Sequence, residues 1–377
     1  MKVLLLYAKV GNGHLKAAEF IRDELKKLDE NIDIFFEDGL EYSSALTNKL
    51  IIKGYASMAK TAPVIYGTIY NKSDTQDTNT VGEINKMVNK AMTIRLKKMI
   101  RKLSPDVIVS THPFISHMCG YLKRKGKTDA KILSIFTDYG IHNMWLEENE
   151  SIDKLLMATD EMKKDCIREY EVDESKIAVT GIPVSPKFKQ EYNKKEILDE
   201  LGLKENKKTI LFCAGGGLGL GKSDELLEEM LESNYDFQLI VVTGKNEKQK
   251  AAFEKMVKKY SKDVCILGYT NKMPELMYVS DAVMTKPGGL TSTECLTMKK
   301  PMIIINPIPG QEEQNAIFFT NHGMALRMYK NEPVEHVLDI VMNNSKRLEQ
   351  MKEMCEMYMR PDSALKVAQE IINIYDK

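Results

Sequence analysis

The stretch that most limits the possible fold is 284–316, which contains two strand–loop–helix units in succession. The apolar residues 282–285 predict a short strand, and a tight Pro-Gly-Gly loop at 287–289 leads into a helix. Residues 302–306 predict a second, buried strand, and the prolines and glycine of 307–310 precede another helix. Neighbouring units of this kind are typical of an α/β domain with a parallel sheet.

The polar residues of this stretch lie where α/β sheets bind ligands, at the carboxyl ends of the strands. Helix N-termini there offer free N–H groups and the positive end of a dipole, which suit a diphosphate. Thr291 and Ser292 can cap the first helix, and Glu294 follows in or near its first turn, where a carboxylate can accept both hydroxyls of a ribose. Sugar hydroxyls can be held by the amide and carboxylate groups of the second helix, namely Gln311, Glu312 and Asn315. The stretch therefore predicts a site for a nucleotide that carries a sugar.

The motif KPGG-LT-S-x-E, followed by P-x-PGQE-x-x-NA, resembles the donor-site signature of the GT-B glycosyltransferases that include MurG and the diacylglycerol glycosyltransferases. Within that group it is similar to the branch of the bacterial processive diacylglycerol glucosyltransferases and the plant monogalactosyldiacylglycerol synthases. The resemblance extends over nearly the whole chain and implies an α/β protein of the GT-B fold, with two Rossmann-like domains facing across a cleft. It implies an acceptor- and membrane-binding domain at 1–183, a UDP-sugar-binding domain at 184–360, and a C-terminal helix at 361–377 that crosses back to the first domain.

The resemblance also implies how the donor is held. Glycine loops would give N–H groups to the diphosphate, a strand-end loop would present backbone groups to the uracil ring, and Glu294 would bind the ribose. The implied donor-binding residues are Gly216, Gly217, Gly268, Tyr269, Met273, Gly288, Gly289, Leu290, Thr291, Glu294, Gln311, Glu312 and Asn315. No DxD-like carboxylate pair occurs in a strand-end loop of the second half. We therefore expect no metal and no cofactor, with the UDP-hexose as a substrate.

A glycine-rich loop after the first predicted strand carries the candidate catalytic residue. It begins at Gly11 and Gly13 and, with Asp38 after the second strand, suggests a dinucleotide-binding fingerprint, but Lys16 stands where the third glycine is needed. In the glycosyltransferase branch the same loop reads GxGHxxAA, which this chain matches through His14. An imidazole that titrates near neutrality is a suitable general base for the acceptor hydroxyl. The alternative is that His14 caps the helix or only binds the acceptor.

A second acceptor-side segment runs from Thr137 to Trp145 and resembles the family's TD-x-x-x-H-x-x-W segment. Its tryptophan, the only one in the chain, either covers a lipid glycerol or sugar face or packs the domain interior. His112 ends another predicted strand at the same rim and is expected to be a hydrogen-bonding residue rather than a catalyst. The implied acceptor-binding residues are Gly13, His112, Asp138, His142 and Trp145.

Residues 216–223 form a literal GxxxxGKS between a predicted strand and a helix, which is the context of a phosphate-binding P-loop. A P-loop NTPase also needs an apolar strand ending in Asp to hold magnesium, and the strands predicted here end in Gly or Thr. The glycosyltransferase family carries a glycine-rich loop at this position, so Lys222 becomes a surface or secondary phosphate contact. Three alternatives to a diacylglycerol hexosyltransferase remain: a MurG-like N-acetylglucosaminyltransferase, a P-loop ATPase or GTPase, and an inactive UDP-sugar sensor.

Composition indicates a soluble globular protein, with 43% hydrophobic and 29% charged residues. No apolar run reaches the ~18–20 residues that a membrane helix needs, and the N-terminus does not resemble a signal peptide. Six scattered cysteines without a CxxC pair favour free thiols in the cytoplasm. The formal net charge of zero argues against a nucleic-acid binder, and no obligate protein partner is inferred.

Two acid-free stretches predict contact with a membrane surface. Tyr42–Ser73 holds four lysines among aliphatic and aromatic residues, a mixture that suits an anionic bilayer containing diacylglycerol. The predicted basic helix Asn85–Leu103 either adds to this surface or is an ordinary solvated helix face. We therefore expect a peripheral protein on the cytoplasmic face of the membrane, and the sequence leaves open whether the hexose is glucose or galactose.

Overall fold

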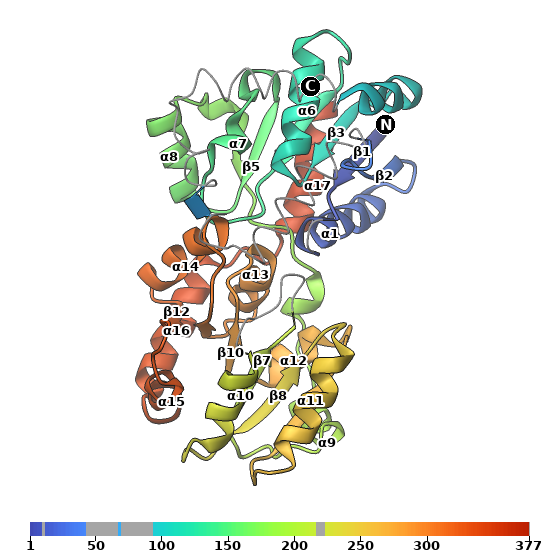
Figure 1. Ribbon diagram of the computed structural model, residues 1–377. Coiled ribbons are helices and arrows are strands. Elements are labelled where there is room, and N and C mark those ends of the chain that lie inside the picture. Colours follow the sequence, from blue (N-terminus) through green and yellow to red (C-terminus); the bar gives the residue numbers. More distant parts are fainter. Residues whose placement is uncertain (10–11, 43–66, 69–92, 216–222, 377) are drawn as a thin grey trace. The chain divides into compact units, whose positions relative to one another are not determined.

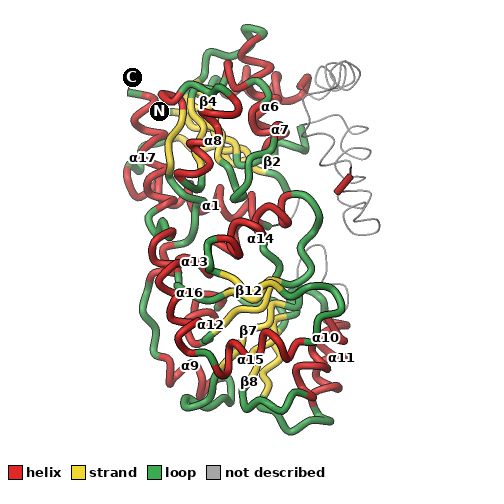
Figure 2. The backbone as a smooth tube through the Cα atoms, turned by 90° about the vertical axis from the view of Figure 1, so that its left-hand side faces the viewer, coloured by secondary structure: helices red, strands yellow, loops and turns green. Residues whose placement is uncertain are grey.

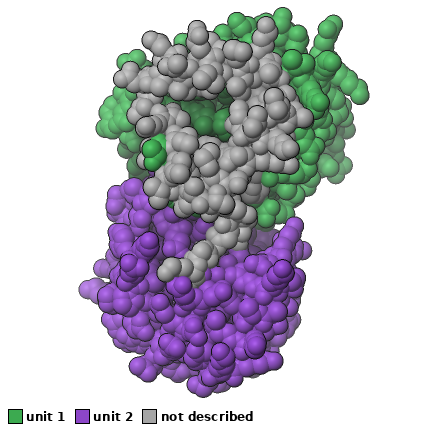
Figure 3. Space-filling view, viewed as in Figure 1, with its two compact units in different colours: residues 1–185, 308–311, 362–377 green, residues 186–307, 312–361 purple. Residues whose placement is uncertain are grey.

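The computed structural model describes residues 1–9, 12–42, 67–68, 93–215 and 223–376. The chain folds into two compact units (Figure 3). Unit 1 consists of Met1–Ser185, Ile308–Gln311 and Asp362–Lys377, and unit 2 consists of Pro186–Pro307 and Glu312–Pro361. Most of the predicted membrane stretch Tyr42–Ser73, and the first part of Asn85–Leu103, lie outside the described residues.

Unit 1 is built on a parallel six-stranded sheet in the order β2-β1-β3-β4-β5-β6. Figure 1 labels β1, β2, β3 and β5 of this sheet. β1 is buried at every position after its first residue, and its apolar sequence KVLLLY is what a strand covered on both faces requires. The strands are β1 (Lys2–Tyr7), β2 (Asp33–Asp38), β3 (Val107–Ser110), β4 (Lys131–Ile135), β5 (Lys154–Met157) and β6 (Ile177–Val179).

Helices cover the sheet of unit 1. The first helix, α1, and the C-terminal helix, α17, pack on each other, and their residues Ile21 and Ile371 share one core with Val3 and Leu5 of β1. The C-terminal helix thus belongs to the unit that the start of the chain builds. The described helices of this unit include α1 (Gly13–Leu28), α6 (Pro113–Arg124), α7 (Asn143–Leu146), α8 (Asp160–Tyr170) and α17 (Ser363–Tyr375), with 3-10 turns η2 (Asn149–Ser151) and η3 (Glu174–Lys176). A further helix covers 93–103.

Unit 2 repeats the plan with a second parallel sheet in the order β12-β11-β10-β7-β8-β9. The two strands predicted at 282–285 and 302–306 form β10 and β11, which pair with each other. The strands are β7 (Thr209–Cys213), β8 (Gln238–Val242), β9 (Val264–Leu267), β10 (Ala282–Thr285), β11 (Met302–Ile304) and β12 (Ala325–Arg327).

Helices flank the strands of unit 2 on both sides (Figure 2). On one face, Phe212 and Met284 of the sheet share a core with Leu227 of α10 and Val337 of α15. The helices are α9 (Lys194–Glu200), α10 (Ser223–Glu232), α11 (Glu247–Val257), α12 (Met273–Val279), α13 (Gly289–Thr297), α14 (Gln311–Asn321), α15 (Val334–Asn343) and α16 (Ser345–Tyr358), with the 3-10 turn η4 (Pro186–Lys189). Within the described parts of the chain, no helix is both long and apolar enough to span a membrane.

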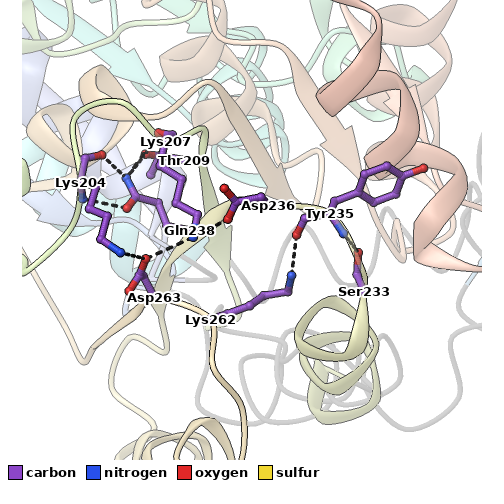
Figure 4. A network of polar contacts seen from close by, with 9 residues as sticks. All are labelled: Lys204, Lys207, Thr209, Ser233, Tyr235, Asp236, Gln238, Lys262 and Asp263. Carbon is purple, nitrogen blue, oxygen red and sulfur yellow. Dashed lines mark hydrogen bonds and ion pairs between the residues drawn. The ribbon is translucent and has the colours of Figure 1, made fainter.

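A polar network closes the amino ends of β7, β8 and β9 (Figure 4). The fully buried Gln238 accepts a hydrogen bond from the backbone N–H of Lys204 at 2.8 Å and donates to Thr209 Oγ1 at 2.8 Å. Asp263 pairs with Lys204 at 2.9 Å and with Lys207 at 3.2 Å. These groups satisfy one another at the end of the sheet opposite to the ligand-binding edge, so the network is a structural one.

Candidate acceptor and donor sites

His14 lies in the first turn of α1, beside the segments that follow β3 and β4. Its Nδ1 atom is 2.5 Å from the carbonyl oxygen of Thr111 and 3.2 Å from Thr137 Oγ1. The Thr111 hydroxyl donates in turn to the His14 carbonyl at 3.0 Å. Because a carbonyl oxygen can only accept, Nδ1 carries the proton and Nε2 presents its lone pair. The two threonines therefore fix the tautomer that a general base needs.

The surroundings of His14 keep its imidazole neutral. The loss of water contact lowers the pKa of His14 below its ordinary value of 6.5, while the nearby Asp138 carboxylate and the Thr111 carbonyl raise it in part. A neutral imidazole at pH 7 is able to take a proton, and Asp138 then stabilises the imidazolium that forms. The structure thus places Asp138, a residue predicted to bind the acceptor, close enough to act on the base.

The ring of His14 contacts the ring of His112. The two rings are 4.7 Å apart and edge to face, and His112 also stacks with Phe114 at 5.6 Å. His112 is 7% exposed, and within the described ranges its Nδ1 atom has no hydrogen-bond partner. Burial, and secondly repulsion from His14 when that ring is protonated, holds the pKa of His112 well below 6.5, so His112 is neutral at pH 7.

The remaining acceptor candidates have structural roles, and their contacts with an acceptor stay predictions. His142 accepts a hydrogen bond at Nδ1 from the backbone N–H of Met144 at 3.1 Å, and so caps the short helix α7. Trp145 is 4% exposed and stacks on Phe136 with 4.7 Å between ring centroids. This position favours packing of the domain interior over covering a lipid glycerol or sugar face. Gly13 is the first residue of α1.

In unit 2, α13 begins differently from the sequence-based expectation. Its N-cap is Gly288, and no side chain in the described part caps it. Thr291 and Ser292, which were expected to cap the helix, lie inside it, because the helix already starts at Gly289. Glu294 consequently lies in the second turn. An N-terminus without a side-chain cap keeps its first N–H groups available to an anion.

The Glu294 carboxylate lies close enough to the carboxyl end of β7 to act on Cys213. It is half-buried, and its carboxylate is one reason, after burial, why the pKa of the Cys213 thiol is raised to about 12. Cys213 is the last residue of β7, so Glu294 lies at the ligand-binding edge of the sheet, as the ribose interpretation requires.

The first turn of α14 carries Gln311 and Glu312, both half-buried. Asn315, expected to bind the hexose, is fully buried and donates from Nδ2 to the carbonyl oxygen of Pro287 at 2.9 Å. It therefore ties α14 to the loop before α13. Lys286, which the sequence does not mark as a site residue, is half-buried here; burial lowers its pKa and Glu312 opposes that shift. In the sequence, Lys286 is recognisable as the lysine of the KPGG motif.

The loop after β9 carries Gly268 and Tyr269, and Met273 starts α12. The Tyr269 ring is 54% exposed, with Lys245 Nζ 5.4 Å from its centroid. The positions of these residues at the carboxyl end of β9 suit a nucleobase contact, which stays a prediction.

The glycine-rich loop itself, with Gly216, Gly217 and Lys222, lies outside the described residues. Its next residue, Ser223, is 4% exposed, and its hydroxyl accepts a hydrogen bond from Gln249 Nε2 at 2.6 Å. A P-loop serine uses this hydroxyl on magnesium, so the contact disfavours the P-loop alternative.

Comparisons with known proteins agree with this picture. Residues 14–184 match the family model of monogalactosyldiacylglycerol (MGDG) synthase, and residues 215–368 match the C-terminal domain of glycosyltransferase family 28. A processive diacylglycerol beta-glucosyltransferase of Bacillus licheniformis is 32% identical over 357 residues, covering 93% of this chain and 89% of that protein. One from Bacillus pumilus is 31% identical over 381 residues, covering 100% and 95%.

Solved structures share the fold at low sequence identity. MurG of Acinetobacter baumannii superposes with a TM-score of 0.66 at 14% identity, covering 99% of each chain. Medicago truncatula UGT71G1, complexed with UDP-glucose, gives 0.65 at 14% identity, covering 100% of this chain and 98% of that one. The Neisseria meningitidis UDP-GlcNAc 2-epimerase bound to UDP-GlcNAc gives 0.61 at 14% identity, covering 99% and 100%. The expected GT-B fold, with two Rossmann-like α/β domains, is confirmed. Since an epimerase shares it, the fold alone does not assign a reaction.

Proposed function

Because the chain belongs to the glycosyltransferase family of the processive diacylglycerol beta-glucosyltransferases, we propose that it transfers a hexose from a UDP-sugar to the hydroxyl of diacylglycerol. The observation that carries the proposal is the state of His14. Its Nδ1 is bonded to the Thr111 carbonyl, so its Nε2 is free to accept a proton. The relatives are named glucosyltransferases, which makes UDP-glucose the first donor to test.

In the reaction we propose, the acceptor oxygen attacks the anomeric carbon as His14 Nε2 takes its proton. The bond from that carbon to the diphosphate oxygen breaks, and UDP leaves with the electron pair. A single displacement of this kind inverts the anomeric carbon. Asp138 contributes by stabilising the imidazolium, since its charge already raises the pKa of His14.

For the donor, we propose that the N–H groups at the start of α13 receive the diphosphate, that Glu294 binds the ribose, and that Gln311 and Glu312 hold the hexose. Such contacts need no metal ion. Transfer is therefore expected to survive chelation of divalent cations, UDP to inhibit it, and ATP to remain unhydrolysed. ATP turnover that disappears in Lys222→Ala would contradict the proposal and support the P-loop alternative.

We further propose that the protein meets its lipid as a peripheral protein on the cytoplasmic face. We assign the main contact to Tyr42–Ser73, most of which lies outside the described residues. Helix 93–103, the described part of the second acid-free stretch, supports a second contact. Leu96, Met99 and Ile100 are buried there, and the opposite side exposes Ile94, Arg95, Lys98, Arg101 and Lys102. A basic face with an exposed aliphatic residue suits an anionic bilayer surface.

The membrane proposal is tested by vesicle co-sedimentation. Replacing Lys49, Lys53 and Lys60 by Glu should reduce binding to anionic vesicles and lipid glycosylation together, while UDP binding in solution stays unchanged. A matched control replaces Lys255, Lys258 and Lys259 of unit 2, all exposed, by Glu. Equal loss of vesicle binding in both triple variants would contradict the assignment of the surface to Tyr42–Ser73.

The reaction is tested by incubating the protein with labelled UDP-glucose, UDP-galactose or UDP-N-acetylglucosamine and vesicles that contain either diacylglycerol or a lipid-linked cell-wall precursor, followed by analysis of the lipids. We expect a labelled glycolipid from a UDP-hexose. A product formed only from UDP-N-acetylglucosamine and a lipid-linked cell-wall precursor would instead establish the MurG-like alternative.

A further inference from the structure

Gly67 approaches the loop that leads into α14 more closely than any other residue type allows. A methyl group on its Cα would lie 2.5 Å from Cβ of Pro309, with Cγ at 3.5 Å and Cα at 3.7 Å. Carbon atoms that touch are about 3.5–4.0 Å apart, so a side chain at this position has to displace the loop by about 1 Å. Gly67 is itself buried. Pro309 belongs to unit 1, which also contains Gly67, although the chain on both sides of Ile308–Gln311 belongs to unit 2.

The loop around Pro309 is short and leads directly into α14. Asn306 and Gly310 have φ angles of 41° and 108°, in the left-handed region, and Gly310 is buried. Gln311 follows at once as the first residue of α14, and Asn315, one turn further, is bonded to the Pro287 carbonyl. A displacement at Pro309 is therefore passed to Gln311, which lies only two residues away.

We propose that Gly67 is a positioning residue for the hexose. Because it has no side chain, the segment 67–68 rests directly on Pro309 and sets the position of Gln311. This inference rests on the proposed function, in which Gln311 holds hydroxyls of the transferred sugar. It extends that function because Gly67, which is far from the donor motifs in the sequence, then controls how the hexose fits. In this proposal Gly67 has no part in binding the uracil, ribose or diphosphate.

The test compares the affinities of UDP-glucose and UDP, measured by calorimetry, for the full-length protein and its variants. Gly67→Ala should weaken UDP-glucose binding by about tenfold, the upper end of what one lost hydrogen bond to a sugar hydroxyl is worth. UDP binding should change less than about twofold, because UDP lacks the hexose. The proline supplies a matched pair of second-site changes. Pro309→Gly removes the Cβ atom that collides and should restore UDP-glucose binding to Gly67→Ala, whereas Pro309→Ala keeps that atom and should not.

Three results would overturn the proposal: wild-type UDP-glucose affinity in Gly67→Ala, an equal loss for UDP and UDP-glucose, or equal rescue by the two proline substitutions. Failure of the proposed function has a different signature. A wild-type protein that transfers no hexose contradicts that function itself, whereas normal transfer by both the wild type and Gly67→Ala contradicts only the role of Gly67.

Discussion

Asn315 offers a quantitative test of how unit 2 holds its donor segments together. The side chain is fully buried, and its Nδ2 donates to the carbonyl oxygen of Pro287, which is itself a buried residue. In Asn315→Ala the carbonyl loses this partner, and an unpaired buried acceptor costs about 1–3 kcal/mol. The missing amide group leaves a small void that adds about 1 kcal/mol, at ~24 cal/mol per Å³ of cavity. We therefore expect a loss of about 2–4 kcal/mol in the free energy of unfolding.

The assay is thermal unfolding followed by calorimetry, in the transition of unit 2. For a domain of its size, each kcal/mol lowers Tm by about 2–4 °C, so the expected shift is roughly 4–16 °C. Ile317→Ala, on the same helix and 47% exposed, is the matched control and should change stability by less than about 0.5 kcal/mol. Equal transition temperatures for Asn315→Ala and wild type would show that the hydrogen bond from Asn315 to Pro287 does not stabilise unit 2. Hexose binding would then be the only role left for Asn315.

Three further predictions concern charged groups. Asp138→Asn removes a charge that raises the pKa of His14, so the acid limb of the kcat/KM profile should move to lower pH and the plateau should fall; an unmoved limb would mean that His14 is not the titrating base. The hydrogen bond from Lys204 lowers the pKa of Asp263, so its stabilisation is present above the ordinary Asp pKa of about 4 and is lost as pH falls through the folded value. Asp263→Asn should accordingly cost about 1–2 kcal/mol at pH 7 in denaturant unfolding, with the difference vanishing in acid, and a pH-independent difference would contradict this. Glu294→Ala should weaken UDP binding by about 1.5–3 kcal/mol in calorimetry if the carboxylate accepts the ribose hydroxyls, and unchanged affinity would exclude that role.

The sequence predicts the architecture well, for a physical reason. Strands such as KVLLLY and QLIVV are covered on both faces, so they appear as short, uninterrupted apolar runs between helices. The same rule places the predicted ligand residues, because loops at the carboxyl ends of parallel strands meet at one edge. His14, Thr111 and Thr137 converge in this way although His14 and Thr111 are 97 residues apart.

What the sequence does not predict depends on atomic contacts between distant residues. Thr291 and Ser292 have good capping side chains, but α13 starts two residues earlier, at Gly289. The sequence around Trp145 is compatible both with covering a ligand and with packing on Phe136, and only the fold distinguishes these two roles. The tautomer of His14 depends on a backbone carbonyl, a group that every residue has, so no motif reveals it.

The central claim is that His14 removes the acceptor proton while other groups hold the nucleotide. The most direct test measures lipid glycosylation and UDP affinity in parallel for wild type and His14→Ala. We predict that turnover falls by a factor of order 10²–10⁴, the usual size of a lost general base, and that UDP affinity is nearly unchanged. Wild-type turnover in the variant, or abolished UDP binding, would contradict the assignment of His14 to proton transfer.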